Sequence, residues 1–209
     1  MTTNTSHGRR LAHRVGGAAF AIAALFLLGG CTGDGEPIVT ETPTPTLTAS
    51  PSPSASPSAT PLTDAELLAL MPADAAFPDV RGAIATAKFF LEQYAPVLET
   101  GDLTVWDALS MPDCIFCESV RTYVATEQAA GEFETGNTLY VDPGQAVANY
   151  YAVDGFTYVT FPYVQDAGVI HHSDGTIDDP GGQQTGKVSL RMTLSGTVWR
   201  ISDVGVEAS

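Results

Sequence analysis

The hydrophobic pattern of residues 63–209 changes its period once, and this change restricts the fold more than any other feature of the 209-residue chain. Up to Gly131, apolar residues recur every three or four positions, which is typical of amphipathic helices. After Gly136, residues rich in Val, Tyr, Thr and Phe alternate with polar ones, which is typical of strands with one buried face. Helices followed by antiparallel strands predict an α+β fold, in which N-terminal helices pack on a curved sheet and enclose a cone.

Three main helices are expected, and each has a residue that can cap its start. These residues are Thr63, which forms a capping box with Glu66, then Asp79 and Asp113. Proline and glycine should interrupt or stop the helices, because proline lacks a backbone N–H and glycine readily adopts the left-handed conformation of a helix end. The interrupting or stopping residues are Pro72, Pro96, Gly101 and Gly131.

The strand-rich part contains five candidate strands separated by turn residues. Asp154-Gly155 and Ser195-Gly196 predict tight turns between antiparallel neighbours. Pro162 suggests a sheet edge or a bulge, and a change of alternation near Asp203 suggests a second bulge. Residues 166–185 are mostly Gly, Asp, Pro, Gln and His, which predicts a long hairpin loop. The candidate strands are 138–141, 145–153, 156–170, 186–194 and 198–206.

The first 31 residues have the pattern of a bacterial lipoprotein signal. Three arginines precede an apolar run at 15–28, and Leu28-Gly29-Gly30-Cys31 places small residues directly before a cysteine. We therefore predict a signal peptide at residues 1–30, cleavage before Cys31 and acylation of Cys31. The mature protein would be anchored in the lipid bilayer, on the extracytoplasmic side of the cell membrane.

Two other interpretations of this segment are open. An uncleaved transmembrane anchor is disfavoured, because the apolar run has 14 residues and a membrane-spanning helix needs about 20. The adjacent Arg9 and Arg10 suggest a twin-arginine export signal, with weak support from the residues around them. Lipoprotein export accounts for the pattern best.

Residues 31–62 separate the signal from the folded part. Thr, Ser, Pro and Ala dominate this stretch, and it has almost no apolar surface to bury, so we predict a disordered tether. Such a tether spans about 30 Å as a flexible coil and about 95 Å as polyproline II. Residues 63–209 then form one domain.

The charge of the predicted mature chain excludes one class of partner. All 24 acidic residues lie after Cys31, against six Lys and Arg, which gives a formal net charge of −18. Because phosphate contacts need clustered Lys and Arg, we predict no nucleic-acid partner. The same charge gives little attraction to an anionic membrane, so acylation would have to supply the attachment.

Three short motifs in residues 79–206 resemble a known family. They are the helix end Glu99-Thr100-Gly101-Asp102, Leu109-Ser110 before a Cys-x-x-Cys, and the tail Thr197-Val198-Trp199-Arg200-Ile201. Together they resemble the NTF2-like (SnoaL-like) cone fold and, more narrowly, a family of actinobacterial lipoproteins with a domain of unknown function. The resemblance implies no activity, because that fold hosts enzymes and binding modules alike. It does imply that a homodimer could form through the open sheet face.

Cys114 and Cys117 are the clearest candidates for a functional site. With Cys31 acylated, they remain as an even pair in an oxidising compartment, and their spacing allows a disulfide. A thiol–disulfide exchanger is one interpretation, since a helix N-terminus lowers a thiol pKa. The βαβ context of thioredoxin-like motifs is missing, so we favour a structural bond that fastens a loop to its helix.

The sequence contains residues that could suggest a metal site, but none that form a recognisable catalytic site. His171-His172 and the nearby aspartates suggest a metal, but adjacent residues of an extended chain point to opposite faces, so exposed loop chemistry is favoured.

No catalytic constellation is recognisable, and we name no catalytic residue, no cofactor and no metal. We predict a non-catalytic binding or accessory module, with a small apolar ligand in the cone. An NTF2-like enzyme acting on a small apolar substrate is the alternative. Aromatic residues that could line the cone are Tyr94, Trp106, Tyr150, Tyr158 and Tyr163.

Overall fold

The computed structural model describes residues 61–179 and 181–209. The predicted signal peptide, Cys31 and almost all of the predicted tether lie outside these residues. Within them, no helix combines the length and hydrophobicity that crossing a membrane requires.

The helices lie where their capping residues predicted. The hydroxyl of Thr63 accepts a hydrogen bond from the Glu66 N–H, and the Glu66 carboxylate accepts one from the Thr63 N–H, which completes the predicted capping box. Gly101 and Gly131 end their helices in the left-handed conformation, as expected. The helices are α1 (Asp64–Leu70), the 3-10 helix η1 (Ala73–Ala76), α2 (Val80–Glu92), α3 (Tyr94–Thr100), α4 (Thr104–Leu109) and α5 (Ile115–Ala130).

Two details differ from the prediction. The long helix is interrupted at Gln93, three residues before Pro96, because proline has no N–H to donate to the carbonyl one turn earlier. The residue that caps α5 is Cys114 and not Asp113, since the Cys114 sulfur accepts a hydrogen bond from the Cys117 N–H at 3.2 Å.

The main sheet is antiparallel and contains most of the predicted strands. Its strands are β2 (Leu139–Val141), β3 (Val147–Tyr151), β4 (Phe156–Gln165), β7 (Gln184–Ser195) and β8 (Val198–Ala208), with a 3-10 turn η2 (Pro143–Gln145) between β2 and β3. The order is β2-β4-β7-β8, and β3 pairs with the other end of β4.

Local irregularities of this sheet also match the sequence pattern. The register of β7 and β8 shifts between Arg191 and Met192, opposite Asp203 and Ile201, which confirms the bulge near Asp203. Pro162 lies between the residues of β4 that pair with β2 and those that pair with β3. On that side, β4 has no neighbouring strand at Pro162, so this position is a sheet edge, as the missing N–H of proline suggested.

A second, three-stranded sheet was not predicted. It has the order β1-β5-β6, with β1 at Phe133–Gly136, β5 at Gly168–His171 and β6 at Ile177–Asp178. The expected strand 156–170 is thus two strands, and the expected loop 166–185 contains two short strands. These strands escaped the sequence analysis because their pairing is non-local: Phe133 faces His171 across 38 residues of chain.

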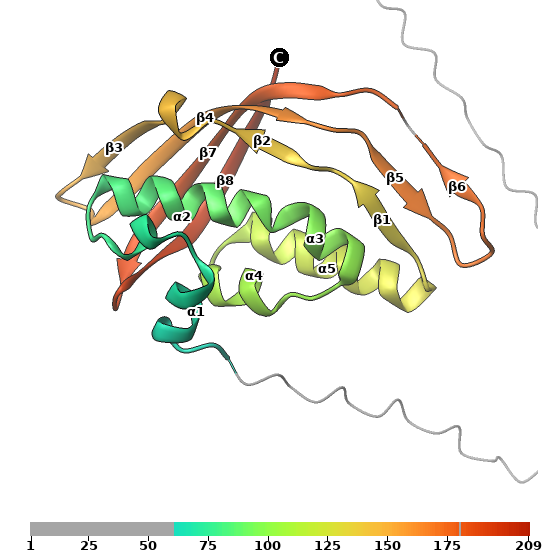
Figure 1. The fold of residues 1–209 in the computed structure, drawn as a ribbon, viewed down its shortest axis with the longest axis horizontal. Helices are drawn as coiled ribbons and strands as arrows, with labels where there is room; N and C mark the ends of the chain where they lie inside the picture. Colours follow the sequence, from blue (N-terminus) through green and yellow to red (C-terminus); the bar gives the residue numbers. More distant parts are fainter. Residues whose placement is uncertain (1–60, 180) are drawn as a thin grey trace, which may run out of the picture. The chain divides into compact units, whose positions relative to one another are not determined.

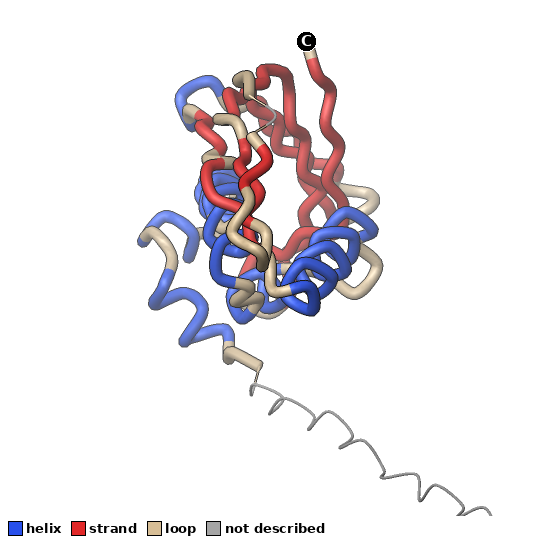
Figure 2. Tube along the Cα trace, turned by 90° about the vertical axis from the view of Figure 1, so that its right-hand side faces the viewer, coloured by secondary structure: helices blue, strands red, loops and turns tan. Residues whose placement is uncertain are grey.

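The helices cover the concave side of the main sheet, and the second sheet extends beyond it next to α5 (Figures 1 and 2). Alternate residues of the long strands are buried on this side, and they pack against α2, α4 and α5. Among the largest fully buried side chains are Phe90, Trp106, Phe161, Leu190 and Ile201. The predicted α+β class, with N-terminal helices packed on a curved antiparallel sheet, is confirmed.

Candidate functional site

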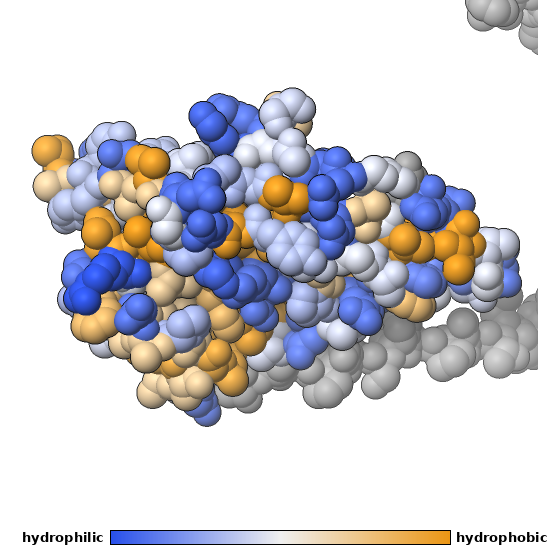
Figure 3. All heavy atoms as spheres, turned by 45° about the horizontal axis from the view of Figure 1, so that its top comes forward, coloured by the Kyte–Doolittle hydropathy of each residue, from blue (hydrophilic) through white to orange (hydrophobic). Residues whose placement is uncertain are grey.

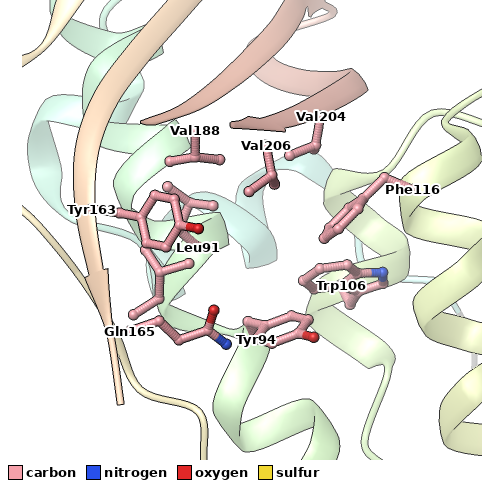
Figure 4. Close-up of a pocket in the computed structure, with 10 residues that line it drawn as sticks. Leu91, Tyr94, Trp106, Phe116, Tyr163, Gln165, Val188, Val204 and Val206 are labelled. Atoms are coloured by element: carbon pink, nitrogen blue, oxygen red, sulfur yellow. The ribbon is translucent and has the colours of Figure 1, made fainter. Parts of the chain in front are cut away.

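A cavity of about 120 Å³ lies between the helices and the concave face of the main sheet. Its walls come from α2, α3, α4 and α5 on one side and from β2, β4, β7 and β8 on the other. Figure 4 shows the side chains arranged around this space. The lining residues are Leu91, Tyr94, Trp106, Phe116, Leu139, Tyr163, Gln165, Val188, Val204 and Val206.

Trp106 is fixed rigidly in the cavity wall. Its ring stacks on Phe90, with the ring centroids 4.2 Å apart, and Phe116 and Tyr94 lie at just over 6 Å. The indole N–H donates a hydrogen bond to the carbonyl oxygen of Cys117 at 3.3 Å. With its only donor satisfied, Trp106 offers an apolar surface to the cavity.

The polar groups of the lining are two tyrosine hydroxyls and one amide. In Figure 4 the Tyr163 hydroxyl points toward the space between the lining residues, the Tyr94 hydroxyl points away from its centre, and the Gln165 amide lies beside Tyr94. Burial raises the pKa of Tyr94, and the negative charge of Glu134 raises it further. Tyr94 is therefore neutral at physiological pH.

The chemistry available to this lining is limited. Among the described residues, no Asp, Glu, His, Lys or Arg lines the cavity, so it offers no group that exchanges protons near neutral pH. What it offers is apolar contact and hydrogen bonding. A cavity lined in this way can hold a small ligand, since an apolar cavity of about 150 Å³ holds benzene.

Three of the five aromatic residues proposed for the cone line the cavity, namely Tyr94, Trp106 and Tyr163. Tyr150 and Tyr158 do not. Tyr150 is exposed on β3, and Tyr158 alternates with the buried residues Thr157 and Val159, so it lies on the outer face of the sheet.

On the outer face of the sheet, Tyr158 belongs to a small aromatic group. Its ring centroid lies 5.3 Å from that of Phe156, and the Arg191 guanidinium lies 4.3 Å above the Phe156 ring. Hydrophobic residues of the side shown in Figure 3 lie in several groups among hydrophilic ones. No partner copy is part of the structure, and pairing through the sheet face stays a prediction.

Cys114 and Cys117 are joined by a disulfide across the first turn of α5. Their exposed fractions are 1% and 0%. Thiol–disulfide exchange needs a thiolate that can reach a sulfur atom, so burial favours a structural bond over an exchanger.

His171 is the last residue of β5, whereas His172 follows it in the turn between β5 and β6, within the predicted loop. Both side chains are half-buried. The His171 ring stacks on Phe133 at 4.5 Å and shares a hydrogen bond with the Thr135 hydroxyl. His172 contacts the carboxylates of Glu132 at 2.8 Å and Asp178 at 3.1 Å. The described residues assemble no group of three or more His, Cys, Asp and Glu that could hold a metal.

The sequence analysis missed Gln165 and the residues behind it, Asn137 and Glu134. Asn137 follows Gly136 and adopts a φ of 55°, which asparagine tolerates better than most residues. That pair was a turn signal, but nothing local indicated that Asn137 would contact Gln165, 28 residues away.

Comparison with known proteins adds information on the fold alone. No family model matches the chain, and no curated protein matches it. The intermembrane space region of chloroplast protein ARC6 resembles it with a TM-score of 0.51 and 13% identity, over 64% of this chain and 99% of that one.

Two bacterial structures have lower TM-scores. An uncharacterized protein with a cystatin-like fold from Caulobacter vibrioides has a TM-score of 0.38 and 13% identity, over 59% of this chain and 87% of that one. The Kfla4162 protein from Kribbella flavida has a TM-score of 0.42 and 11% identity, over 63% and 93%. At these identities an activity cannot be carried from one protein to another, so the function has to be argued from the cavity.

Proposed function

We propose that the described domain is a non-catalytic module that binds a small apolar ligand in its cone cavity. The observation that carries this proposal is the lining: aromatic and aliphatic side chains surround the space, and no acid or base lines it among the described residues. An enzyme of this fold that moves protons would need a carboxylate or histidine in the cone. The alternative, an enzyme acting on a small apolar substrate, has no such group in the lining to support it.

We further propose that the module works at the extracytoplasmic side of the cell membrane, held by an acylated Cys31. The support is in the sequence: the arginines and apolar run before Leu28-Gly29-Gly30-Cys31, and the Pro-rich stretch after them. The same features are the support for a lipoprotein of the actinobacterial type. The tether would hold the domain at a distance from the bilayer, and the acidic surface of the domain would keep the domain soluble there.

Ligand binding is tested with toluene as the probe and Trp106 as the reporter. Trp199 is the other tryptophan of the chain, so a Trp199→Phe background leaves the fluorescence of Trp106 alone. We expect a saturable change in this fluorescence and a rise in Tm, because a ligand that binds only the native state stabilises it.

Val204→Phe should abolish the toluene effect, because Val204 lines the cavity and the larger ring would fill it. Val153→Phe is the matched control: Val153 is 98% exposed, so the same change there should leave toluene binding intact. Equal binding by both variants, or no saturable binding by the parent, would contradict the proposal.

The anchor is tested with Cys31→Ser in the full chain. The variant should move from the membrane fraction to the soluble fraction, while Tm stays unchanged because residue 31 precedes the predicted domain of residues 63–209. Persistent membrane association of Cys31→Ser would rule out acylation at this residue as the attachment.

A further inference from the structure

A chain of hydrogen bonds links Tyr123 of α5 to the cavity. The Tyr123 hydroxyl and the Asn137 side-chain N–H group each donate to the Glu134 carboxylate. The Gln165 side-chain N–H group then donates to the Asn137 carbonyl oxygen at 3.4 Å. Gln165 is the only amide side chain in the described cavity lining, so this chain ends at the cavity wall.

The chemistry of Glu134 sets the direction of every bond in this chain. A carboxylate only accepts, so Tyr123 has to donate its proton and Asn137 has to turn its NH₂ group toward Glu134. The Asn137 oxygen then faces Gln165, which in turn has to present its NH₂ group to Asn137. The Gln165 carbonyl oxygen is left as a hydrogen-bond acceptor, and it has no partner among the described residues.

Asn137 is held firmly enough to transmit this orientation. Its exposed fraction is 9%, and its backbone N–H donates to the Ala167 carbonyl at 3.3 Å. The side chain lies directly over Gly168, where an added Cβ would be 2.5 Å from the Asn137 Nδ2. Glycine at 168 is therefore required for this position of Asn137.

The surroundings of the cavity disfavour a negatively charged ligand. The described lining contains no Lys, Arg or His that could pair with an anion. Glu134 acts on Tyr94 at the same end of the cavity, and its negative charge would repel a carboxylate. The Tyr163 hydroxyl can both donate and accept, so it does not discriminate between ligands.

We propose that the cavity selects neutral, apolar molecules of about benzene size that carry one N–H or O–H donor, which the Gln165 carbonyl oxygen accepts. This inference rests on the proposed binding function and narrows it to one ligand class. Phenol is the simplest member of the class. Toluene has nearly the same shape without the donor, and benzoate carries the disfavoured charge.

The test compares phenol, toluene and benzoate by titration of the Trp199→Phe protein at pH 7. Phenol should bind about threefold to tenfold more tightly than toluene, which is the net effect of one hydrogen bond to a neutral acceptor. Benzoate should bind more weakly than toluene. Equal affinities for phenol and toluene would overturn the inference and leave the apolar binding function standing, whereas no binding of either would overturn both.

Two variants locate the selectivity. Gln165→Leu should remove the preference for phenol while toluene still binds, and Gln145→Leu is the matched control, because Gln145 lies in η2 outside the cavity lining. Gly168→Ala should displace Asn137 and weaken the preference without changing the lining itself. A preference for phenol that survives in Gln165→Leu would show that another group accepts the donor, and it would overturn the assignment.

Discussion

The two sheets of this protein are stabilised in different ways. Alternate residues of β4, β7 and β8 are fully buried, and the buried residues of the described chain include no charged side chain. None of the residues in β1, β5 and β6 is fully buried. The main sheet is therefore held by apolar packing, which is stiff and cooperative, and the second sheet depends on polar contacts that respond to solvent.

The cavity lies against the main sheet, and hydrogen bonds connect its polar end to the second sheet. Glu134 belongs to β1 of the second sheet, while Gln165 is the last residue of β4 in the main sheet. Asn137 joins them. The Gln165 amide is therefore held by contacts that begin in the second sheet, whereas the apolar walls of the cavity belong to the helices and the main sheet.

The largest effect is expected from removing a core side chain of the main sheet. Leu190→Ala should lower the free energy of unfolding by about 2–5 kcal/mol, because Leu190 is fully buried and its loss leaves a cavity. Urea unfolding measures this. The matching change in the second sheet is Ile177→Ala, which should cost less than about 0.5 kcal/mol since Ile177 is 58% exposed. Similar costs for the two variants would contradict the contrast between the sheets.

A smaller effect is expected at the start of α5, the helix that leads from the core to β1. Replacing both Cys114 and Cys117 with Ala should lower stability by about 2 kcal/mol, from the lost loop constraint of so short a ring. The loss of the Cys114 cap adds to this. Thermal and urea unfolding measure the cost, and Ser119→Ala on the exposed side of α5 is the control. Amide exchange should rise in the first turn of α5 and stay unchanged in β1. A rise in amide exchange in β1 alone would contradict the prediction that the disulfide stabilises the first turn of α5.

Local rules made much of the main sheet and its helices predictable. Capping at Thr63, the stop at Gly101 and the bulge opposite Asp203 each depend on residues within one turn or one strand pair. The division into helices first and strands second followed from the period of the apolar pattern alone.

The second sheet and the polar end of the cavity were not predictable in the same way. β1 and β5 are short, and they form only because distant segments pair. Asn137 follows the end of β1 and Gln165 ends β4, and no sequence motif indicates that their side chains form a hydrogen bond. Cys114 took the capping role expected of Asp113, since the sequence pattern does not show which polar atom reaches the Cys117 N–H. For the second sheet and for Asn137 the missing information is a tertiary contact, whereas for the cap it is the local side-chain geometry of the first turn of α5.

The smallest effect is expected in the second sheet, and it should depend on pH. Hydrogen bonds to Glu132 and Asp178 raise the pKa of His172 to about 9, and Asp174 lies in the adjoining turn. Since an unperturbed histidine has a pKa of about 6.5, the folded state favours the charged form. The contribution to stability is complete below pH 6.5 and is lost as the pH rises through 9. The hairpin at 168–178 should therefore open more often at pH 9.5 than at pH 6.

NMR titration of the His172 ring gives its pKa directly, and amide exchange of β5 and β6 reports the opening. His172→Gln is the reference at each pH, because it shares the intrinsic exchange rates but has no charge to lose. The ratio of the exchange rates of the native protein to those of His172→Gln should increase between pH 6.5 and 9.5. It should stay constant in β7, whose stability comes from apolar burial. A titration of His172 near pH 6.5, or a ratio that changes equally in β7, would show that this polar contact does not distinguish the second sheet from the first.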